Sequence, residues 1–368
     1  MMFPLLLACV RPDGEDADKP GTRPDVVSST TYEDTSDRDG YLTIPVEVKD
    51  GAAAFQIIVK RNRGMLSTEY LYDPEEELIL DWEDWYDSSF SLTESFFPTE
   101  FATTLNWPVR EEDGPLEEGT YEVVISTLDA QGYYSGGENV QVEVLTRTVP
   151  ADERVLRAVI AYAEGVRDED GVVEGVEDAV DYWVELYAAV GITLEPSYAD
   201  IAVDAQLPDT YEGLEAISAF HEDSDQRTAL LIVGERIADD RWLYGEAGGI
   251  PGPYAAADHA AVFVSWLANA GADGEFQEAD VLLFGETMAH EVGHYLGLFH
   301  PVEDGFEYWD ALSDTEDCSA IGSCERDLGS NLMFPYPVCT SASAGSCERQ
   351  DAITGDQAGV LQGWVGVE

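Results

Sequence analysis

The sequence of 368 residues is poor in positive charge. It holds 18 Lys and Arg against 75 Asp and Glu, and its formal net charge is −57. Lysine occurs only at Lys19, Lys49 and Lys60, so most of the positive charge is arginine. Such a chain repels nucleic-acid backbones and anionic membrane surfaces, which excludes both as partners. A salt-adapted surface and a GC-rich codon bias both account for this composition.

A short apolar run opens the chain and ends in cysteine at residue 9. It is too short to span a bilayer as a helix, which takes about 20 residues. Leu6-Leu7-Ala8-Cys9 resembles the lipobox of a bacterial lipoprotein signal, which implies lipidation at Cys9, although no Lys or Arg precedes it as in such signals. A buried N-terminal strand is the alternative. Residues 10–39, dominated by Pro, Asp, Glu, Ser and Thr, predict an acidic disordered linker.

Cysteine is also scarce. Four of the five cysteines lie close together near the C-terminus, at Cys318, Cys324, Cys339 and Cys347. An even number of cysteines in a loop-rich segment of an exported chain predicts two disulfides, for which three pairings exist. A structural zinc site of four thiolates is the competing interpretation, and the lack of a C-x2-C pair argues against it.

Two regions with different patterns follow the linker. Residues 40–149 contain short runs of β-branched and aromatic residues between turn signals, which predict an all-β, sandwich-like domain. In residues 150–368, expected strands alternate with helices predicted over 175–190 and 280–296. This alternation predicts an α/β (α+β) domain with helices against one sheet.

The strongest motif lies on the second predicted helix, in the segment His-Glu-Val-Gly-His that starts at His290. His290 and His294 are four residues apart, so a helix places both imidazoles on one face, where they can hold one zinc ion. Gly297 allows a positive φ, so the chain can turn and bring His300 back as a third ligand. Three protein ligands leave a position for water, as a catalytic zinc requires. Glu291 can then act as general base on that water.

The eleven residues from His290 to His300 resemble the zinc-binding motif of the metzincin metalloprotease clan. The clan has a methionine turn beneath the zinc, and Asn331-Leu332-Met333-Phe334-Pro335 resembles it. Within the clan, the chain is most similar to the pappalysin-like group, through Leu-Gly-Leu after the helix, Ser313-Asp314-Thr315 and the segment 353–357. The resemblance covers about residues 151–368. It implies a metzincin-like catalytic domain, here preceded by the β-sandwich-like domain.

The resemblance also implies roles for residues of the methionine turn. Met333 is expected to pack beneath the zinc ligands without binding the metal. A tyrosine commonly stands two residues after this methionine, but here that residue is Pro335. Tyr336 lies one position further and is the candidate for an oxyanion- or zinc-facing role. Pro301 stands where the group usually has a threonine.

These features predict an exported zinc endopeptidase, either a cell-envelope lipoprotein or an extracellular protein. It would hydrolyse peptide bonds of extracellular proteins with a zinc-activated water and Glu291 as general base. The protein or peptide substrate is expected to lie extended beside an edge strand within residues 248–264. A membrane is expected as a partner only through the lipid anchor. The alternatives are a degenerate protease, against which the intact Glu291 argues, and an adhesion or envelope lipoprotein in which the β domain matters most.

A cluster of acidic residues follows the third histidine, at Asp304, Glu307, Asp310, Asp314, Glu316 and Asp317. Calcium favours several carboxylates in flexible loops, so calcium is a second candidate cofactor. A solvated acidic loop is the alternative interpretation.

Overall fold

The computed structural model describes residues 26–86, 88–148, 154–208, 214–223, 228–238, 240, 242–255, 257, 259–270, 274–303, 305–315, 318–339 and 349–368. The predicted lipidation site Cys9, the cysteine Cys347 and the acidic residues Asp304, Glu316 and Asp317 lie outside these ranges. None of the helices within them is both long and apolar enough to cross a membrane.

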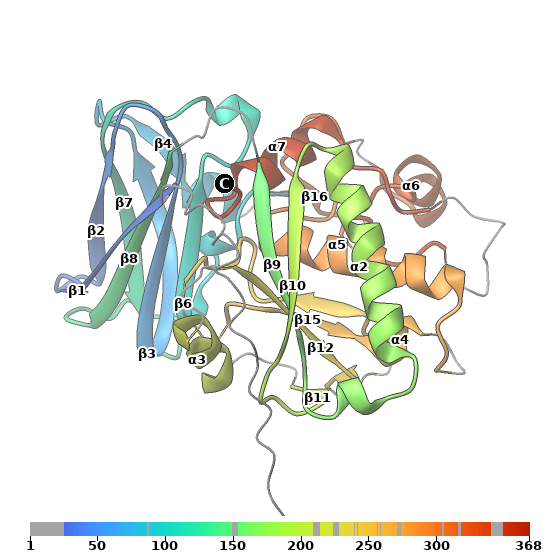
Figure 1. The fold of residues 1–368 in the computed structure, drawn as a ribbon. Helices are drawn as coiled ribbons and strands as arrows, with labels where there is room; N and C mark the ends of the chain where they lie inside the picture. The colour runs from blue at the N-terminus through green and yellow to red at the C-terminus, as the bar shows by residue number, and fades with distance from the viewer. Residues whose placement is uncertain are drawn as a thin grey trace, which may run out of the picture.

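A β-rich N-terminal part lies beside a second part in which helices pack on a central sheet (Figure 1). The N-terminal part contains a seven-stranded sheet with the order β1-β8-β3-β7-β2, and β4 and β6 also pair with β3. Its elements are β1 (Val27–Thr35), β2 (Tyr41–Val48), β3 (Ala52–Tyr72), β4 (Leu78–Asp81), α1 (Trp82–Tyr86), β5 (Phe90–Ser91), η1 (Glu94–Phe96), β6 (Thr99–Trp107), η2 (Glu111–Asp113), β7 (Gly119–Leu128) and β8 (Asn139–Thr148).

Strand β3 connects two groups of strands. Its first half pairs with β6 and β8, and its second half pairs with β4, β7 and the start of β6. The alternating residues Ile44 and Val46 of β2 and Ile57 and Val59 of β3 are fully buried in one cluster. This alternation arises because successive side chains of a strand point to opposite faces. Side chains from both groups of strands therefore fill one apolar core.

The prediction of a disordered linker through residue 39 was wrong for its last part, which contains strand β1. Residues Val27–Thr35 pair antiparallel with β8 along the whole length of the strand. Most of its side chains are exposed, so main-chain hydrogen bonds rather than apolar burial hold it in place. Because the burial is small, the polar composition of this segment gave no sign of a strand.

The second part is built on a five-stranded sheet with the order β10-β9-β12-β15-β14. The first four strands are parallel, and β14 pairs antiparallel with β15 at the edge. The elements of this part are β9 (Val155–Tyr162), η3 (Val166–Asp168), α2 (Val172–Ala189), β10 (Thr193–Asp200), β11 (Gln206–Leu207), α3 (Glu215–Asp223), β12 (Ala229–Gly234), β13 (Arg236–Ile237), β14 (Gly245–Ala247), β15 (Val262–Ser265), α4 (Trp266–Asn269), α5 (Glu278–Tyr295), β16 (Trp309–Asp310), α6 (Ile321–Leu328) and α7 (Gly355–Gly363).

The central strands β9, β12 and β15 are almost entirely apolar and buried, as strands of a parallel sheet covered on both faces are. Helix α2 buries Val176, Val180, Trp183 and Tyr187, which recur at helical spacing. The Tyr187 hydroxyl donates a hydrogen bond of 3.0 Å to the carbonyl oxygen of Ala289 in α5. This packing fixes the position of α5 relative to the sheet.

The two parts contact each other through buried polar groups as well as apolar ones. The fully buried Gln56 of β3 donates to the Gly252 carbonyl oxygen (3.2 Å) and accepts from the Tyr254 amide (2.7 Å). Asn106 of β6 accepts from the amide of Val365 near the C-terminus, at 3.0 Å. Ile58 of β3 belongs to the apolar cluster of the second part. The β-rich part is therefore packed against the segment that follows strand β14.

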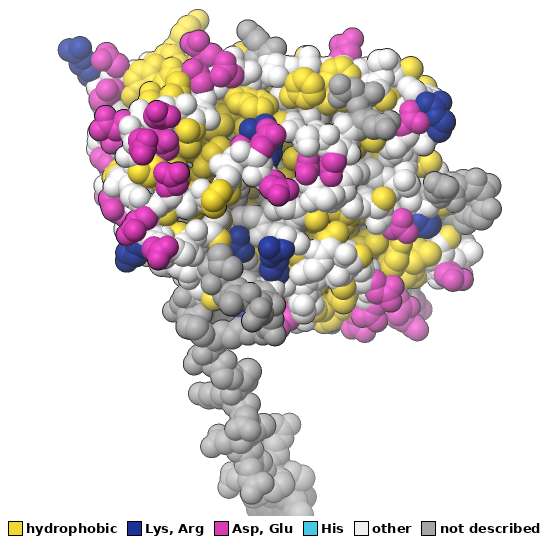
Figure 2. Space-filling view, turned by 90° about the horizontal axis from the view of Figure 1, so that it is seen from above, with side chains coloured by type: hydrophobic (Ala, Val, Ile, Leu, Met, Phe, Trp, Pro, Cys, Tyr) yellow, Lys and Arg dark blue, Asp and Glu magenta, His cyan; other side chains and the backbone are white. Residues whose placement is uncertain are grey.

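Acidic side chains are spread over the surface. In the face shown in Figure 2, Asp and Glu side chains outnumber Lys and Arg and are interspersed with apolar side chains. On this face the negative charge is thus spread rather than gathered in one patch.

Candidate metal centre

Helix α5 carries the histidine motif and is anchored at both ends. At its start, the side chain of Asp280 accepts a hydrogen bond from the Gln277 amide at 3.1 Å, which satisfies one of the free donors of the first turn. At its end, Gly297 has a φ of +116°, a conformation that L side chains rarely adopt. The Leu298 amide donates back to the Gly293 carbonyl oxygen at 2.9 Å, so the helix ends sharply there.

The turn at Gly297 brings three imidazoles together. The Nε2 atom of His294 lies 3.1 Å from the Nε2 atom of His290 and 3.1 Å from that of His300. The Nε2 atoms of His290 and His300 are 3.3 Å apart. Within the described residues, these three side chains form the group that could hold a metal ion.

Each of the three imidazoles uses its other nitrogen as a donor. The Nδ1 atom of His290 donates to the Leu332 carbonyl oxygen (2.7 Å), that of His294 to the Leu298 carbonyl oxygen (2.6 Å), and that of His300 to the Glu303 carboxylate (2.7 Å). A neutral imidazole that carries its proton on Nδ1 has a lone pair on Nε2. All three lone pairs therefore point at one place, and the Nδ1 partners fix the orientation of each ring.

The triad fits a divalent transition metal. Two nitrogens bound to a tetrahedral zinc at 2.0–2.1 Å lie about 3.3 Å apart, close to the observed separations. Burial and, to a smaller extent, the neighbouring His300 together lower the pKa of His290 to about 3. Burial also lowers the pKa of His294. Neutral histidines are the form that binds metal, and converging lone pairs are stabilised by a cation between them.

Glu291 lies against the edge strand β14. A Cβ atom added at Gly245 would be 2.3 Å from the Cγ atom of Glu291, so only glycine leaves room for this carboxylate. Burial and, to a smaller extent, the charge of Glu246 together raise the pKa of Glu291 to about 8. A cation on the neighbouring histidines favours the carboxylate form and lowers this pKa.

A cavity of about 640 Å³ opens over the triad and Glu291. Strand β14 and the residues before it line the cavity, as do Leu332 and the segment 334–337. The edge strand beside the site was expected within residues 248–264, and this prediction was wrong by a few residues. The edge is Gly245–Ala247, whereas Val262–Ser265 is the interior strand with which it pairs.

Met333 lies beneath helix α5. Its side chain is fully buried, and a Cβ atom added at Gly293 would be 2.7 Å from the Met333 sulfur. Gly293 lies directly before His294, so the thioether packs under the part of the helix that carries two of the histidines. The neighbouring Leu332 supplies the carbonyl oxygen that orients His290. The structure thus places Met333 near the triad, and its role there stays a prediction.

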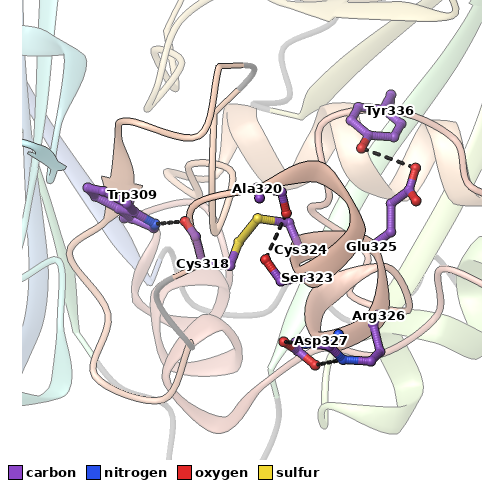
Figure 3. Close-up of a disulfide and its surroundings, with 9 residues drawn as sticks. All are labelled: Trp309, Cys318, Ala320, Ser323, Cys324, Glu325, Arg326, Asp327 and Tyr336. Carbon is purple, nitrogen blue, oxygen red and sulfur yellow. Dashed lines mark hydrogen bonds and ion pairs between the residues drawn. A yellow bond between two sulfur atoms is a disulfide. The ribbon is translucent and has the colours of Figure 1, made fainter.

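Tyr336 and the disulfide between Cys318 and Cys324 both contact helix α6 (Figure 3). Tyr336 lines the cavity, and its hydroxyl donates to Glu325 of α6 at 3.4 Å. Its oxyanion-facing role stays a prediction. Cys318 and Cys324 form a disulfide across the start of α6, and Cys339 is also disulfide-bonded. A disulfide in this segment was predicted, and the one between Cys318 and Cys324 confirms it.

Two described members of the acidic cluster, Asp310 and Asp314, hold loops together. The Asp310 carboxylate accepts from the Thr315 hydroxyl at 2.5 Å. The Asp314 carboxylate accepts from the Thr354 hydroxyl (2.8 Å) and from the Asp356 amide (2.9 Å). Calcium at this cluster stays a prediction, because half of its members lie outside the described residues.

Two residues at the cavity have no local signal in the sequence. Gly245 makes room for Glu291, as described above. Glu94 of the β-rich part also lines the cavity. Its carboxylate accepts from the Ile250 amide at 3.0 Å, and its own amide donates to the Ile250 carbonyl oxygen at 2.8 Å. These contacts join residues 156 positions apart, so only the folded chain shows them.

Comparisons with known proteins find only distant similarity. No family model matches the chain, and no curated protein matches it. Among solved structures, metalloproteinase-II from Bacteroides fragilis is similar over 52% of this chain and 61% of its own, with 11% identity and a TM-score of 0.29. A family two carbohydrate esterase from Clostridium thermocellum is similar over 55% of this chain and 60% of its own, with 8% identity and a TM-score of 0.17. A metalloproteinase is therefore among the structural neighbours, but likeness at this level carries no argument about activity.

Proposed function

We propose that this protein is a zinc-dependent endopeptidase with His290, His294 and His300 as metal ligands and Glu291 as general base. The observation that carries this proposal is the convergence of three imidazole Nε2 atoms within 3.3 Å of one another, next to a carboxylate in an open cavity. Three nitrogen ligands and an open side are the arrangement of a catalytic rather than a structural zinc.

The chain's own residues define the chemical steps. When bound, zinc supplies Lewis-acid activation of water and a positive charge that stabilises a developing oxyanion. Glu291 accepts a proton from the attacking water and passes it to the leaving amine nitrogen. The Nδ1 partners of the three histidines keep the rings oriented while charge develops.

Substrate binding follows from the edge position of β14. Strand β14 pairs with β15 on one side, and its other side faces the cavity. An extended peptide can add to such an edge through main-chain hydrogen bonds, with alternate side chains in neighbouring pockets. The proposed substrate class is therefore an extended segment of a protein or a peptide.

The proposal includes a metzincin-like catalytic domain in residues 150–368 and export of the chain. Support for export comes from the disulfide between Cys318 and Cys324, because disulfides persist in oxidising compartments. A lipid anchor at Cys9 is part of the same proposal. The catalytic-domain proposal rests on the motif from His290 to His300 and on Met333 packed beneath it.

Digestion of a peptide library with mass-spectrometric readout tests the activity. The wild type should cleave peptides internally and lose this activity with a chelator. Glu291→Gln keeps the shape but removes the proton acceptor, so it should retain zinc and lose about 10²- to 10⁴-fold in turnover. Glu278→Gln, an exposed Glu at the start of the same helix, should cleave like the wild type. Chelator-resistant cleavage, or full turnover by Glu291→Gln, would contradict the proposal.

A further inference from the structure

Two short motifs distant in sequence interlock near the start of helix α7. The Asp314 carboxylate accepts from the Thr354 hydroxyl and from the Asp356 amide. The Asp356 carboxylate in turn accepts from the Ser313 hydroxyl at 2.7 Å. These bonds hold the first turn of α7 in place. None of these residues lines the cavity, so the catalytic proposal leaves the motifs without a role.

Gln357, in the first turn of α7, continues this network inward. Its side chain is fully buried and forms a reciprocal pair with Asn331, 26 positions earlier. The side-chain Nδ2 of Asn331 donates to the Gln357 Oε1 atom at 2.9 Å. The side-chain Nε2 of Gln357 donates to the Asn331 Oδ1 atom at 3.1 Å. A buried side-chain amide without a hydrogen-bond partner destabilises the folded protein. The two side chains therefore stay paired, and the pair fixes the position of Asn331.

Asn331 is in turn hydrogen-bonded to the turn beneath the triad. Its side-chain oxygen also accepts from the Met333 amide at 2.8 Å, which closes a tight turn around Leu332. The carbonyl oxygen of Leu332 is the acceptor for Nδ1 of His290, at 2.7 Å. A continuous hydrogen-bonded path therefore runs from Gln357 through Asn331 and the turn to a ring of the triad.

We infer that Gln357 is a positioning residue for His290, acting through Asn331 and the Leu332 carbonyl. The inference rests on the proposed metal centre. The partners that orient a metal-binding histidine set its tautomer and angle, and their loss typically costs about 10- to 100-fold in metal affinity. The Leu332 carbonyl is such a partner of His290, and Gln357 fixes its position through Asn331.

The alternative is that Gln357 only braces the fold. Main-chain bonds tie the turn to the segment before α7 without it, because the Leu332 amide donates to the Ala352 carbonyl oxygen (2.7 Å) and the Ala352 amide donates to the Ser330 carbonyl oxygen (2.9 Å). The turn therefore stays attached when the amide pair is lost. A simple brace would change the stability of the protein and leave its metal affinity unchanged.

The test compares two matched substitutions in the same helix. Gln357→Met removes the amide pair and keeps a long unbranched side chain. Gln362→Met is the control, since Gln362 donates to the Val190 carbonyl oxygen at 2.6 Å and its side chain takes no part in the path to Asn331. Zinc affinity is measured on the full chain by competition with a chromogenic chelator, and thermal unfolding is followed with and without excess chelator.

Gln357→Met should weaken zinc binding by about 10- to 100-fold. Its unfolding temperature in chelator should fall more than that of Gln362→Met, because it leaves the buried side-chain amide of Asn331 without its partner. Gln362→Met should bind zinc like the wild type, so zinc affinity rather than stability separates the two interpretations. Should Gln357→Met fail to fold, Gln357→Asn replaces it, because the shorter amide cannot reach Asn331; the same loss of affinity is expected.

Wild-type zinc affinity in the folded Gln357 variant, or an equal loss in Gln362→Met, would overturn the inference. A wild type that binds zinc but cleaves no peptide would refute the proposed protease activity and leave the inference standing. A wild type that binds no divalent metal would overturn both.

Discussion

Gly245 and Glu291 depend on each other through a single contact. A methyl group at position 245 would lie 2.3 Å from the Glu291 Cγ atom and 2.9 Å from its carboxylate oxygen. Glu291 would then have to move, or β14 would have to shift away from the helix. Either displacement changes the distance from the proposed general base to the reacting atoms.

Gly245→Ala should therefore lower turnover by about 10²-fold, because misplacement of a catalytic group by roughly 1 Å has an effect of that size. Zinc content should be unchanged, since no ligand is touched, and stability should fall by about 1–3 kcal/mol from overpacking. Gly359→Ala in α7 is the matched control, because an added Cβ there meets nothing within 4 Å. Peptide turnover and urea unfolding of both variants check this; wild-type turnover by Gly245→Ala would show that Glu291 does not need its observed position.

The spacing in the sequence predicted the residues of the triad because they are local. His290 and His294 share a helix face, and Gly297 allows the turn that returns His300, with the expected positive φ. The residues that orient them are distant in sequence. Gln357 reaches the site through Asn331, and Glu94 contacts Ile250 from η1 of the β-rich part. No local pattern predicts such pairings, because they depend on how the whole chain packs.

Among the secondary-structure elements, the long helices were predicted closely. The apolar spacing predicted helices over 175–190 and 280–296, and the structure has Val172–Ala189 and Glu278–Tyr295. The two errors are strands with few buried side chains. Strand β1 is held by main-chain pairing to β8, and β14 is only three residues long. Neither leaves a strong alternation in the sequence, because alternation reflects burial of one face.

Helix α6 depends on the disulfide between Cys318 and Cys324, which closes a loop with a sequence separation of 6. Closing a loop this short stabilises a protein by about 2 kcal/mol in the chain-entropy account. Both cysteines pack in a small cluster with Val302, Leu328 and Phe334. The double variant Cys318→Ala/Cys324→Ala should therefore lose about 2 kcal/mol or somewhat more in urea unfolding.

The same variant should keep its zinc, because the triad lies on α5 and the turn after it. Its cavity wall should loosen, since α6 carries Glu325, the partner of the Tyr336 hydroxyl. An unchanged free energy of unfolding would show that the disulfide does not stabilise this segment.

The molecule as a whole carries a formal net charge of −57. Charges of one sign repel each other more in the compact state than in the unfolded chain, so they destabilise the fold. Raising the ionic strength from 0.01 to 1 M shortens the screening length from about 30 Å to about 3 Å and weakens this repulsion.

The unfolding temperature should therefore rise as sodium chloride is added, and calorimetry or intrinsic fluorescence can follow it. Sodium chloride is the suitable salt because sulfate stabilises proteins regardless of their charge. A temperature that stays constant or falls over this range would show that the distributed acidic surface does not limit stability.

Metal analysis of the purified protein beside His294→Ala tests the metal centre most directly. His294 is the buried middle ligand, with its Nε2 atom 3.1 Å from those of both His290 and His300. The wild type should contain about one zinc per chain, as a single three-ligand site requires, and His294→Ala should lose most of it. A wild type without zinc, or a His294→Ala variant that retains a full equivalent, would contradict the assignment of these three histidines as the metal ligands.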